Sequence, residues 1–273
     1  MPELPEVETI VRHYRPRLEG RRITRFVSRW AKQAEPNVAA VRRGIVGKRI
    51  RRLWRRAKFI VADLDGGRRP AYLLIHLRMS GRFEWAAEHE REPRHVRTIF
   101  DLDDGNTLWL CDSRKFGKVI YTTDFAAATS HLGAEPLEPT FTPATFERLL
   151  HGHARQLKPL LLDQSFVAGL GNIYVDEALF RAGLHPATRS NELIAEQARR
   201  LRREIRAVLR KAIRHHGTSF DSVYPDGGMK RHLKVYGRTG LPCVLCGTPV
   251  AGLRIAQRGT HICPKCQPLD GKR

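Results

Sequence analysis

The chain has 273 residues, of which 41% are hydrophobic and 28% are charged, a composition typical of a folded globular protein. It carries 49 Lys and Arg against 28 Asp and Glu, and this net charge of +21 favours a polyanionic partner, most commonly nucleic acid. The sequence contains no run near 18 apolar residues and no basic, apolar leader. The absence of both features predicts a protein of the reducing cytoplasm and argues against a membrane-spanning or secreted protein.

The first 130 residues are predicted to contain one leading helix followed mostly by β structure. A helix is expected from residue 5 to about residue 18, because apolar residues recur at helical spacing between Val7 and Leu18. Short apolar runs then alternate with turns, which is typical of strands and hairpins. The expected strands lie at residues 58–64, 70–79, 97–102 and 107–110, and the expected hairpin turns are DGG (65–67) and DDGN (103–106). This half is therefore expected to fold as a β-sandwich or β-barrel.

A proline-containing segment at 132–143 separates this half from a second half with helical patterns. Helices are expected at residues 143–152, 157–164, 172–183 and 191–216. In the last of these an apolar stripe runs from Leu201 to Ile213, and Gly217 is a residue type that commonly ends helices. We therefore expect three parts, at residues 1–130, 131–240 and 241–273, and the last of these is a small cysteine-bearing module.

The strongest signal for a metal site lies in this last part. Cys243 and Cys246 form one C-x-x-C pair, and Cys263 and Cys266 form a second pair after sixteen intervening residues. Four thiolates at this spacing suit the corners of a structural zinc site better than redox chemistry. The sequence therefore predicts one structural zinc in a β-hairpin zinc ribbon, whose turn, QRGT (257–260), would project Arg258.

Two further motifs are ambiguous when they are taken alone. Gly169 and Gly171 precede a helix expected to begin near Asn172, and backbone N–H groups at a helix start can bind phosphate. HLRMSG and DSRKFG place Met79 and Phe116 beside cationic residues. Such side chains either belong to a core below a charged surface or wedge into a stack of bases.

The first ten residues, MPELPEVETI, contain three Glu and no Lys or Arg, in contrast to the basic chain that follows. Removal of Met1 would leave Pro2 with a secondary amine that can attack an electrophilic sugar carbon. Glu3 could then donate or accept a proton, and Glu6, about one helical turn on, could orient the pair. The alternative is that Pro and Glu simply begin a helix well.

These motifs occur together and in order along the chain. MPELPEVETI is followed by RRAKFI, HLRMSG, DSRKFG, LLLDQSFVAGLGNIYVDEALF and VYGRTG, and then by the two cysteine pairs. In this combination the sequence closely resembles the bacterial formamidopyrimidine-DNA glycosylase family over nearly its whole length. The resemblance implies an α+β protein with an N-terminal β-sandwich and a leading helix. It also implies a C-terminal helical domain that contains a helix–two-turn–helix and a β-hairpin zinc finger.

The resemblance further implies an activity. The enzyme would excise oxidised purines, such as formamidopyrimidines and 8-oxoguanine, from double-stranded DNA and cleave the strand by β,δ-elimination. It would act as a monomer in the bacterial cytoplasm, associated with the nucleoid through DNA. Pro2 would be the nucleophile and Glu3 the proton donor and acceptor. Lys58 would serve the β-elimination and Arg258 the δ-elimination.

The same resemblance implies a set of DNA contacts. Met79, Arg114 and Phe116 match a trio that fills the gap left by the flipped base, which offsets part of the cost of unstacking. Further DNA-contacting positions are matched by His76, His95, His153, Lys158 and Asn172.

The sequence departs from the family pattern at three places. Only His95 is present where two histidines often precede a strand, and Lys115 replaces a frequent Arg, which keeps the charge but loses a bidentate fork. The usual glycine–aromatic segment that caps the flipped base is not recognisable in residues 218–238. Two alternatives therefore stay open: an endonuclease VIII-like glycosylase for oxidised pyrimidines, and a zinc-dependent DNA-binding protein without catalysis.

Overall fold

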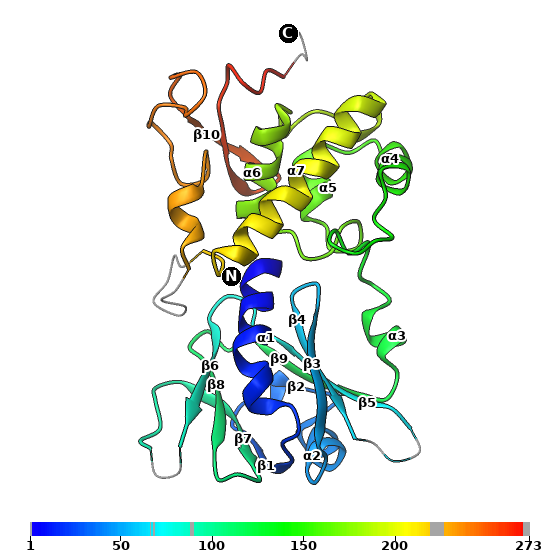
Figure 1. Cartoon of the computed structure of the whole chain (residues 1–273), viewed down its shortest axis with the longest axis vertical. Coiled ribbons are helices and arrows are strands. Elements are labelled where there is room, and N and C mark those ends of the chain that lie inside the picture. Colours follow the sequence, from blue (N-terminus) through cyan, green and yellow to red (C-terminus); the bar gives the residue numbers. More distant parts are fainter. Residues whose placement is uncertain (1, 66, 68, 88–89, 219–226, 270–273) are drawn as a thin grey trace. The chain divides into compact units, whose positions relative to one another are not determined.

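The computed structural model describes residues 2–65, 67, 69–87, 90–218 and 227–269, and the helices and strands named below are labelled in Figure 1. The chain divides into two compact units between Ser130 and His131, and each unit is described by itself. No helix among the described residues combines the length and the apolar character that crossing a bilayer requires.

The first unit begins with helix α1 (Leu4–Leu18), which confirms the expected leading helix. Glu3 is its N-cap residue and Pro5 lies in its first turn, where the fixed backbone angle of proline and its missing N–H are tolerated. The apolar stripe faces inward and is buried, including Leu4, Val7 and Tyr14. The helix packs against the sheet strands β3 (Ile50–Arg56) and β4 (Phe59–Leu64), so its N-terminus is held by the core of the unit.

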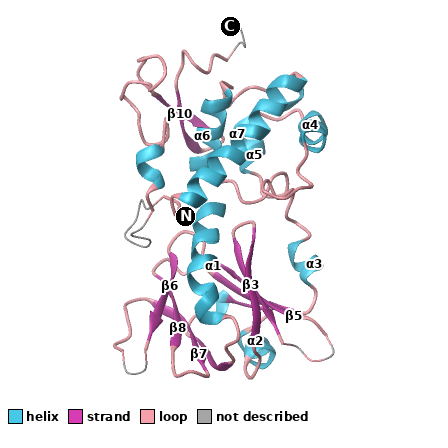
Figure 2. Ribbon diagram, viewed as in Figure 1, coloured by secondary structure: helices cyan, strands magenta, loops and turns pink. Residues whose placement is uncertain are grey.

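Two β-sheets form the body of this unit, and Figure 2 shows their strands in magenta. One sheet has the antiparallel order β1 (Ile23–Ser28), β7 (Val96–Leu102), β8 (Thr107–Asp112), β6 (Gly81–Ala86). The other has the order β2 (Ala34–Glu35), β9 (Lys118–Thr122), β5 (Ala71–His76), β4 (Phe59–Leu64), β3 (Ile50–Arg56), in which only the β2–β9 pair is parallel.

The core of the unit lies between the two sheets. Ile60 and Leu73 from one sheet, Phe100 and Leu108 from the other, and Leu18 of α1 line one enclosed apolar space. This arrangement confirms the expected β-sandwich with a leading helix. The turn expected at 103–106 joins β7 to β8, whereas the turn expected at 65–67 lies partly outside the described residues.

Three short elements complete the first unit, namely η1 (Ala31–Gln33), α2 (Val38–Ile45) and α3 (Phe125–Thr129). Helix α2 packs closely on β9 at Gly44, where a Cβ atom would lie only 2.5 Å from the ring of Tyr121. The absence of a side chain at Gly44 therefore permits this close approach. Sequence analysis assigned none of these elements, although Val38, Val41 and Ile45 of α2 recur at helical spacing after the N-cap residue Asn37.

The second unit contains helices α4 (Pro143–His151), α5 (Leu157–Leu162), α6 (Asn172–Ala182) and α7 (Ala195–Arg214) and the short turns η2 (Ser190–Glu192) and η3 (Met229–His232). Helix α7 packs on α4 and α6 through a buried stripe that includes Leu201, Ile205 and Leu209. The helix expected from residue 191 begins only at Ala195. Residues 190–192 form a separate turn, and the carbonyl of Leu193 is bonded to the His151 ring at 2.9 Å.

The last element is an antiparallel hairpin of β10 (Ala251–Ile255) and β11 (Arg258–Ile262). Its turn consists of Ala256 and Gln257, which both have positive φ angles (46° and 62°). The expectation of a turn at 257–260 was therefore wrong, because Gly259 belongs to strand β11, where its carbonyl is used as an acceptor. Arg258 still follows the turn directly, as the first residue of the strand.

Candidate functional site

The N-terminus of α1 gathers two buried carboxylates next to Pro2. The backbone N–H of Glu3 donates to Oε2 of Glu6 at 2.9 Å, and both residues are buried. Carboxylates are stabilised at a helix N-terminus by the positive end of the helix dipole. Because Glu6 fixes the backbone of Glu3, it also fixes the peptide bond that leads to Pro2, which is itself buried.

Lys58 lies in a tight turn that is tied to the same helix. Ala57 (φ 52°) and Lys58 form the two-residue turn between β3 and β4. The buried Arg55 side chain donates to Glu8 of α1 at 3.1 Å and to the carbonyl of Ala57 at 3.1 Å. This Arg55 bridge therefore holds the turn that carries Lys58 to α1.

The charge of Glu8 is secured by its neighbours. Burial raises the pKa of Glu8, but the hydrogen bonds and charges of Arg12 and Arg55 outweigh burial and hold that pKa below its ordinary value. Glu8 therefore stays ionised as the anchor of the Arg55 bridge at neutral pH.

His76 ends strand β5 as a neutral ring with a defined tautomer. Burial, followed by the charges of Arg78 and Lys58, lowers the pKa of His76 to about 3. Its Nδ1 accepts the backbone N–H of Arg78 at 3.0 Å, so the single proton of the neutral ring resides on Nε2. Phe59 packs edge to face against the ring at 4.8 Å between centroids. His76 can therefore offer one N–H donor without carrying a charge.

The proposed gap-filling trio lies on two loops that leave one sheet at the same end. Met79 and Phe116 are 45% and 48% exposed, so both large apolar side chains are accessible to a partner. The guanidinium of Arg114 lies 4.9 Å from the Phe116 ring centre, which is a cation–π contact. Strands β6 and β8 pair Gly81 with Asp112, so the residues before Gly81 and those after Asp112 emerge side by side.

Two of the expected DNA-contacting histidines are exposed, and each accepts a hydrogen bond at its backbone carbonyl. His95 is exposed, has a positive φ angle of 68°, and accepts the N–H of Asp112 at its carbonyl. His153 is exposed, packs its ring against Phe166 at 5.4 Å, and accepts the Ser190 hydroxyl at its carbonyl.

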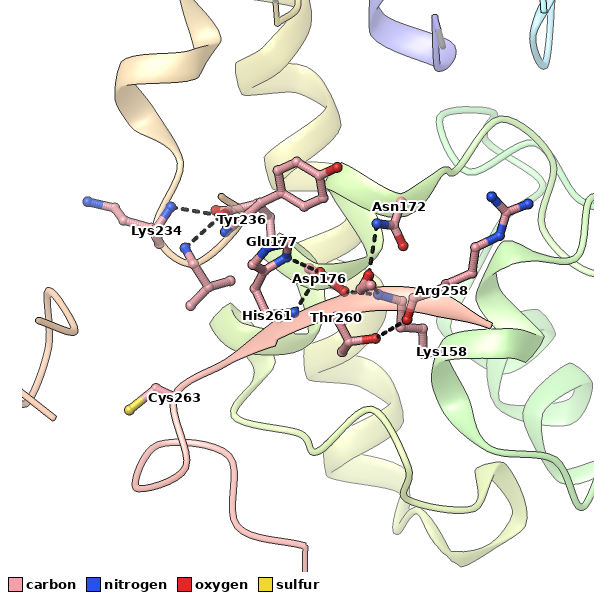
Figure 3. A network of polar contacts seen from close by, with 12 residues as sticks. Lys158, Asn172, Asp176, Glu177, Lys234, Tyr236, Arg258, Thr260, His261 and Cys263 are labelled. Atoms are coloured by element: carbon pink, nitrogen blue, oxygen red, sulfur yellow. Dashed lines mark hydrogen bonds and ion pairs between the residues drawn. The ribbon is translucent and has the colours of Figure 1, made fainter. Parts of the chain in front are cut away.

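In the second unit a buried ion pair anchors the β10–β11 hairpin, as Figure 3 shows. Lys158 and Asp176 are both fully buried, and the ammonium donates to Oδ1 of Asp176 at 2.6 Å and to the carbonyl of Gly259 at 2.8 Å. The other carboxylate oxygen of Asp176 accepts the backbone N–H and Nδ1 of His261 at 2.9 and 3.0 Å. As placed, Lys158 supports the hairpin, and the expected phosphate contact would require it to leave Asp176.

The network leaves Asn172 and Arg258 at its margin. Asn172 opens helix α6, and its amide donates to the carbonyl of Gly259 at 3.0 Å, while its Oδ1 has no hydrogen-bond partner among the described residues. Arg258 is exposed, and Figure 3 shows its guanidinium pointing away from Asp176.

A second buried acid, Glu177, fixes the segment that follows η3. Its Oε1 accepts the backbone N–H groups of Lys234, Val235 and Tyr236 at 2.7, 2.9 and 3.1 Å. Burial raises the pKa of Glu177, although these three bonds favour its charged form. Sequence analysis singled out neither Asp176 nor Glu177, although adjacent acids inside the otherwise apolar NIYVDEALF were a visible signal.

The four expected cysteines meet in one cluster, and their sulfur atoms all lie within 4.8 Å of one another. Backbone N–H groups of Leu245 and Cys266 point at the Sγ atoms of Cys243 and Cys263, both at 3.4 Å. Gln267 accepts the N–H of Cys263 and donates to the carbonyl of Leu184, which ties the cluster to the end of α6. This donor set fits one structural zinc, as the sequence predicted.

Models of known families match three consecutive stretches of the chain. The formamidopyrimidine-DNA glycosylase N-terminal domain matches residues 1–119, and the H2TH domain of the same enzyme matches residues 132–223. A zinc finger found in FPG and IleRS matches residues 240–269. The chain belongs to the formamidopyrimidine-DNA glycosylase family.

Individual members of this family agree with the assignment. The formamidopyrimidine-DNA glycosylase of Symbiobacterium thermophilum is 42% identical over 98% of this chain and 90% of its own length. That of Herpetosiphon aurantiacus is 41% identical over 98% of this chain and 100% of its own length.

Solved structures of the family have the same fold. A mutant Fpg of Lactococcus lactis, in complex with DNA containing Fapy-dG, matches with a TM-score of 0.91 at 34% identity, covering 98% of this chain and 100% of that chain. MutM in complex with DNA containing carbocyclic 8-oxo-G matches with a TM-score of 0.91 at 33% identity, with the same coverage.

Proposed function

We propose that the chain is a bifunctional formamidopyrimidine-DNA glycosylase that also cleaves the DNA strand at the abasic site it creates. Glycosylase activity in base excision repair follows from membership of the family. The strand cleavage is our inference, and the observation that carries it is the buried Glu3–Glu6 arrangement beside Pro2. With Met1 removed, this arrangement sets a secondary amine next to a fixed carboxyl group.

The chemistry follows from these groups. The neutral amine of Pro2 attacks C1′ of the damaged nucleotide, the bond between C1′ and the base breaks, and the base departs with the proton that the amine gives up. Glu3 gives a proton to the ring oxygen as the sugar opens, which leaves an iminium ion between Pro2 and C1′. The iminium accepts electrons from the neighbouring carbon, so the carboxylate of Glu3 takes a proton from C2′ and the 3′ phosphate departs. A second elimination removes the C4′ proton and releases the 5′ phosphate, and water then hydrolyses the iminium to free Pro2.

Other residues are proposed to hold the damaged double-stranded DNA. Lys58 places a positive charge next to His76, whose Nε2–H is available as a neutral donor to a phosphate oxygen. The N-terminus of α6 at Asn172 and the exposed Arg258 suit further phosphates, because a helix N-terminus favours anions. The exposed Met79 and Phe116 suit insertion into the base stack. The net charge of +21 supports this partner, with which we expect the protein to associate on the nucleoid.

The experiment that tests the proposal is borohydride trapping on duplexes that contain 8-oxoguanine, formamidopyrimidine, thymine glycol or a preformed abasic site. The protein with a C-terminal tag should give a covalent adduct, and mass spectrometry should place the sugar remnant on Pro2. A tag fused before Pro2 should abolish the adduct while binding to undamaged duplex persists. A remnant on Lys58, or full activity with the N-terminal tag, would contradict the proposed role of Pro2.

The same panel decides between the two lesion classes. Residues 218–238 lack the usual capping segment, and residues 219–226 of this stretch lie outside the described part of the chain. This departure is the observation that keeps oxidised pyrimidines as a second candidate. We expect formamidopyrimidine and 8-oxoguanine to be cut faster than thymine glycol, and the reverse order would favour the endonuclease VIII-like specificity.

A further inference from the structure

One buried carboxylate, Asp112, joins the two loops that carry Met79, Arg114 and Phe116. Asp112 is fully buried at the end of strand β8. Its Oδ1 accepts the hydroxyl of Ser80, which directly follows Met79, and the backbone N–H of Arg114 at 3.2 Å. Its Oδ2 accepts the N–H of Gly117, which directly follows Phe116, at 2.7 Å.

The sheet, and not the loops, sets the position of this carboxylate. The N–H of Asp112 donates to the carbonyl of His95 at 2.9 Å, and its own carbonyl accepts Nε of Arg97 at 3.0 Å. Gly81 pairs with Asp112 in the β6–β8 ladder. The side chain of Asp112 is therefore a fixed acceptor to which both loops attach.

Ser80 and Gly117 show how closely the loops fit this acceptor. The Ser80 Oγ also accepts the Arg114 N–H at 3.1 Å, so one hydroxyl bridges both loops. A Cβ atom at Gly117 would lie 3.0 Å from Nε2 of Gln33 and 3.2 Å from Oδ2 of Asp112, which leaves little room for a side chain there.

The loops need such support because their own backbones are strained. Arg78 (φ 53°) and Lys115 (φ 62°) adopt the left-handed region, which is uncommon for residues other than glycine and is maintained by surrounding contacts. Side chains that are ordered before binding avoid the entropy cost of being ordered during insertion. The contacts of Asp112 therefore bear on how readily the trio enters the base stack.

We propose that Asp112, acting with Ser80, is a positioning residue that orders the gap-filling trio before the DNA is bound. The inference rests on the proposed function, in which Met79, Arg114 and Phe116 fill the space of the flipped base. Asp112 touches neither the base nor the sugar in this scheme, and its removal affects the insertion step rather than the contacts with phosphates.

The test compares Asp112→Ala, Asp112→Asn and Ser80→Ala with the unchanged protein. Insertion is followed by the fluorescence of 2-aminopurine placed opposite the lesion, excision by single-turnover kinetics, and phosphate contacts by the salt dependence of binding to undamaged duplex. Thr107→Val is the matched control, because it removes a hydroxyl–carboxylate bond of 2.9 Å to Asp101 at the other end of β8.

We expect Asp112→Ala to slow both insertion and excision at least about tenfold, because it removes three hydrogen bonds to a charged acceptor and the loss of one such bond already corresponds to about this factor. The salt dependence should be unchanged. Asp112→Asn keeps one acceptor oxygen and should recover part of the loss. Ser80→Ala should slow insertion less, and its effect should be smaller in the Asp112→Ala background, because the bond between Ser80 and Asp112 is already lost there and only the bond from the Arg114 N–H remains to be removed. Thr107→Val should behave as the unchanged protein.

Met79→Ala separates the two ways in which the idea can fail. If Met79→Ala changes neither insertion nor excision, the trio does not fill the gap, and that part of the proposed function is wrong. If Met79→Ala slows both but a folded Ser80→Ala and Asp112→Asn do not, only the positioning role of Asp112 is wrong. A loss that Thr107→Val reproduces would also overturn it, since general weakening of the sheet would then explain the result.

Discussion

The loops at the end of the β6–β8 ladder and the β10–β11 hairpin both carry side chains that we propose contact DNA, but the two regions are held in different ways. The loops attach to a four-stranded sheet through backbone pairing and the carboxylate of Asp112. The hairpin has only two strands, which are marginally stable alone, and depends on the cysteine cluster and on the Lys158–Asp176 pair. We therefore expect that losing a contact in the loops loosens the positions of their side chains, whereas losing a contact in the hairpin unfolds it.

The largest effect should come from the zinc ligands. Cys263→Ser, or removal of zinc by a chelator, should unfold the hairpin, because binding of a structural zinc contributes on the order of 10 kcal/mol or more to folding. Elemental analysis of protein purified without chelator should find one zinc per chain. Substitution of Cys111, which lies outside the cluster in strand β8, is the control and should leave the zinc content unchanged. Protein that is folded and binds DNA normally without zinc would contradict this view of the hairpin.

The next largest effect should follow from breaking the buried ion pair. Asp176→Ala leaves the ammonium of Lys158 buried without its anion, which typically costs about 3–5 kcal/mol. Denaturant unfolding measures the loss, and proteolysis should show that it is greatest in the hairpin. The control is Arg155→Gln, which breaks the largely exposed pair with Asp163 and should cost less than about 1 kcal/mol. If the two variants lose equal free energy of unfolding, the burial of the Lys158–Asp176 pair does not make it more important for stability than the Arg155–Asp163 pair.

A change of stability with pH, of intermediate size, is expected from His76, which ends β5 directly before the loop that carries Met79. Its pKa of about 3 lies below the ordinary 6.5, so between these values the unfolded chain binds a proton that the folded chain does not. Stability therefore falls as the pH drops from about 6.5 towards 3, by at most about 1.4 kcal/mol per pH unit. Unfolding curves between pH 7.5 and pH 5 should show a smaller slope for His76→Gln, which keeps an acceptor for Arg78. An unchanged slope would mean that His76 is not buried as a neutral ring.

The smallest change in stability should come from Glu6→Ala, which removes the acceptor of the Glu3 N–H at the start of α1. Loss of a helix cap typically costs about 1 kcal/mol. Excision should fall much further than stability, because Glu3 and Pro2 lose their fixed orientation. Thr9→Val is the matched control on the same helix, since it removes a side-chain bond of 2.8 Å to the carbonyl of Pro5 without touching Glu3 or the Arg55 bridge. Thermal unfolding together with single-turnover excision would separate the two effects, and a loss of activity no larger than the loss of stability would exclude an orienting role.

Much of the fold was predictable because its signals are local. The inward stripe of α1 and the strands β4, β5, β7 and β8 follow from apolar spacing within a few residues. The zinc cluster follows from two C-x-x-C pairs, because each pair can place two thiolates at adjacent corners of a tetrahedron. The hairpin turn was misplaced since glycine suggested a turn at Gly259, where the backbone is extended and paired.

The partners of the supporting acids could not be predicted because they are far away in the sequence. Asp112 accepts from Ser80, 32 residues away, and Asp176 accepts from His261, 85 residues away. No residue near either aspartate in the sequence indicates which donor it will meet. The pairing of β6 with β8 brings Ser80 to Asp112, and the packing of α6 on β11 brings His261 to Asp176.

By itself, the sequence determined which chemical groups this protein has: a proline at position 2 beside glutamates, a four-cysteine zinc site and a large positive charge. These features depend on residue type and on short spacings along the chain, so they can be recognised without knowledge of the fold. The tertiary structure alone decided how individual side chains are held. Lys158 is a buried support of the hairpin, His76 is a neutral ring with one N–H donor, and Asp112 joins two loops. Burial and distant partners decide protonation and orientation, and both exist only once the chain has folded.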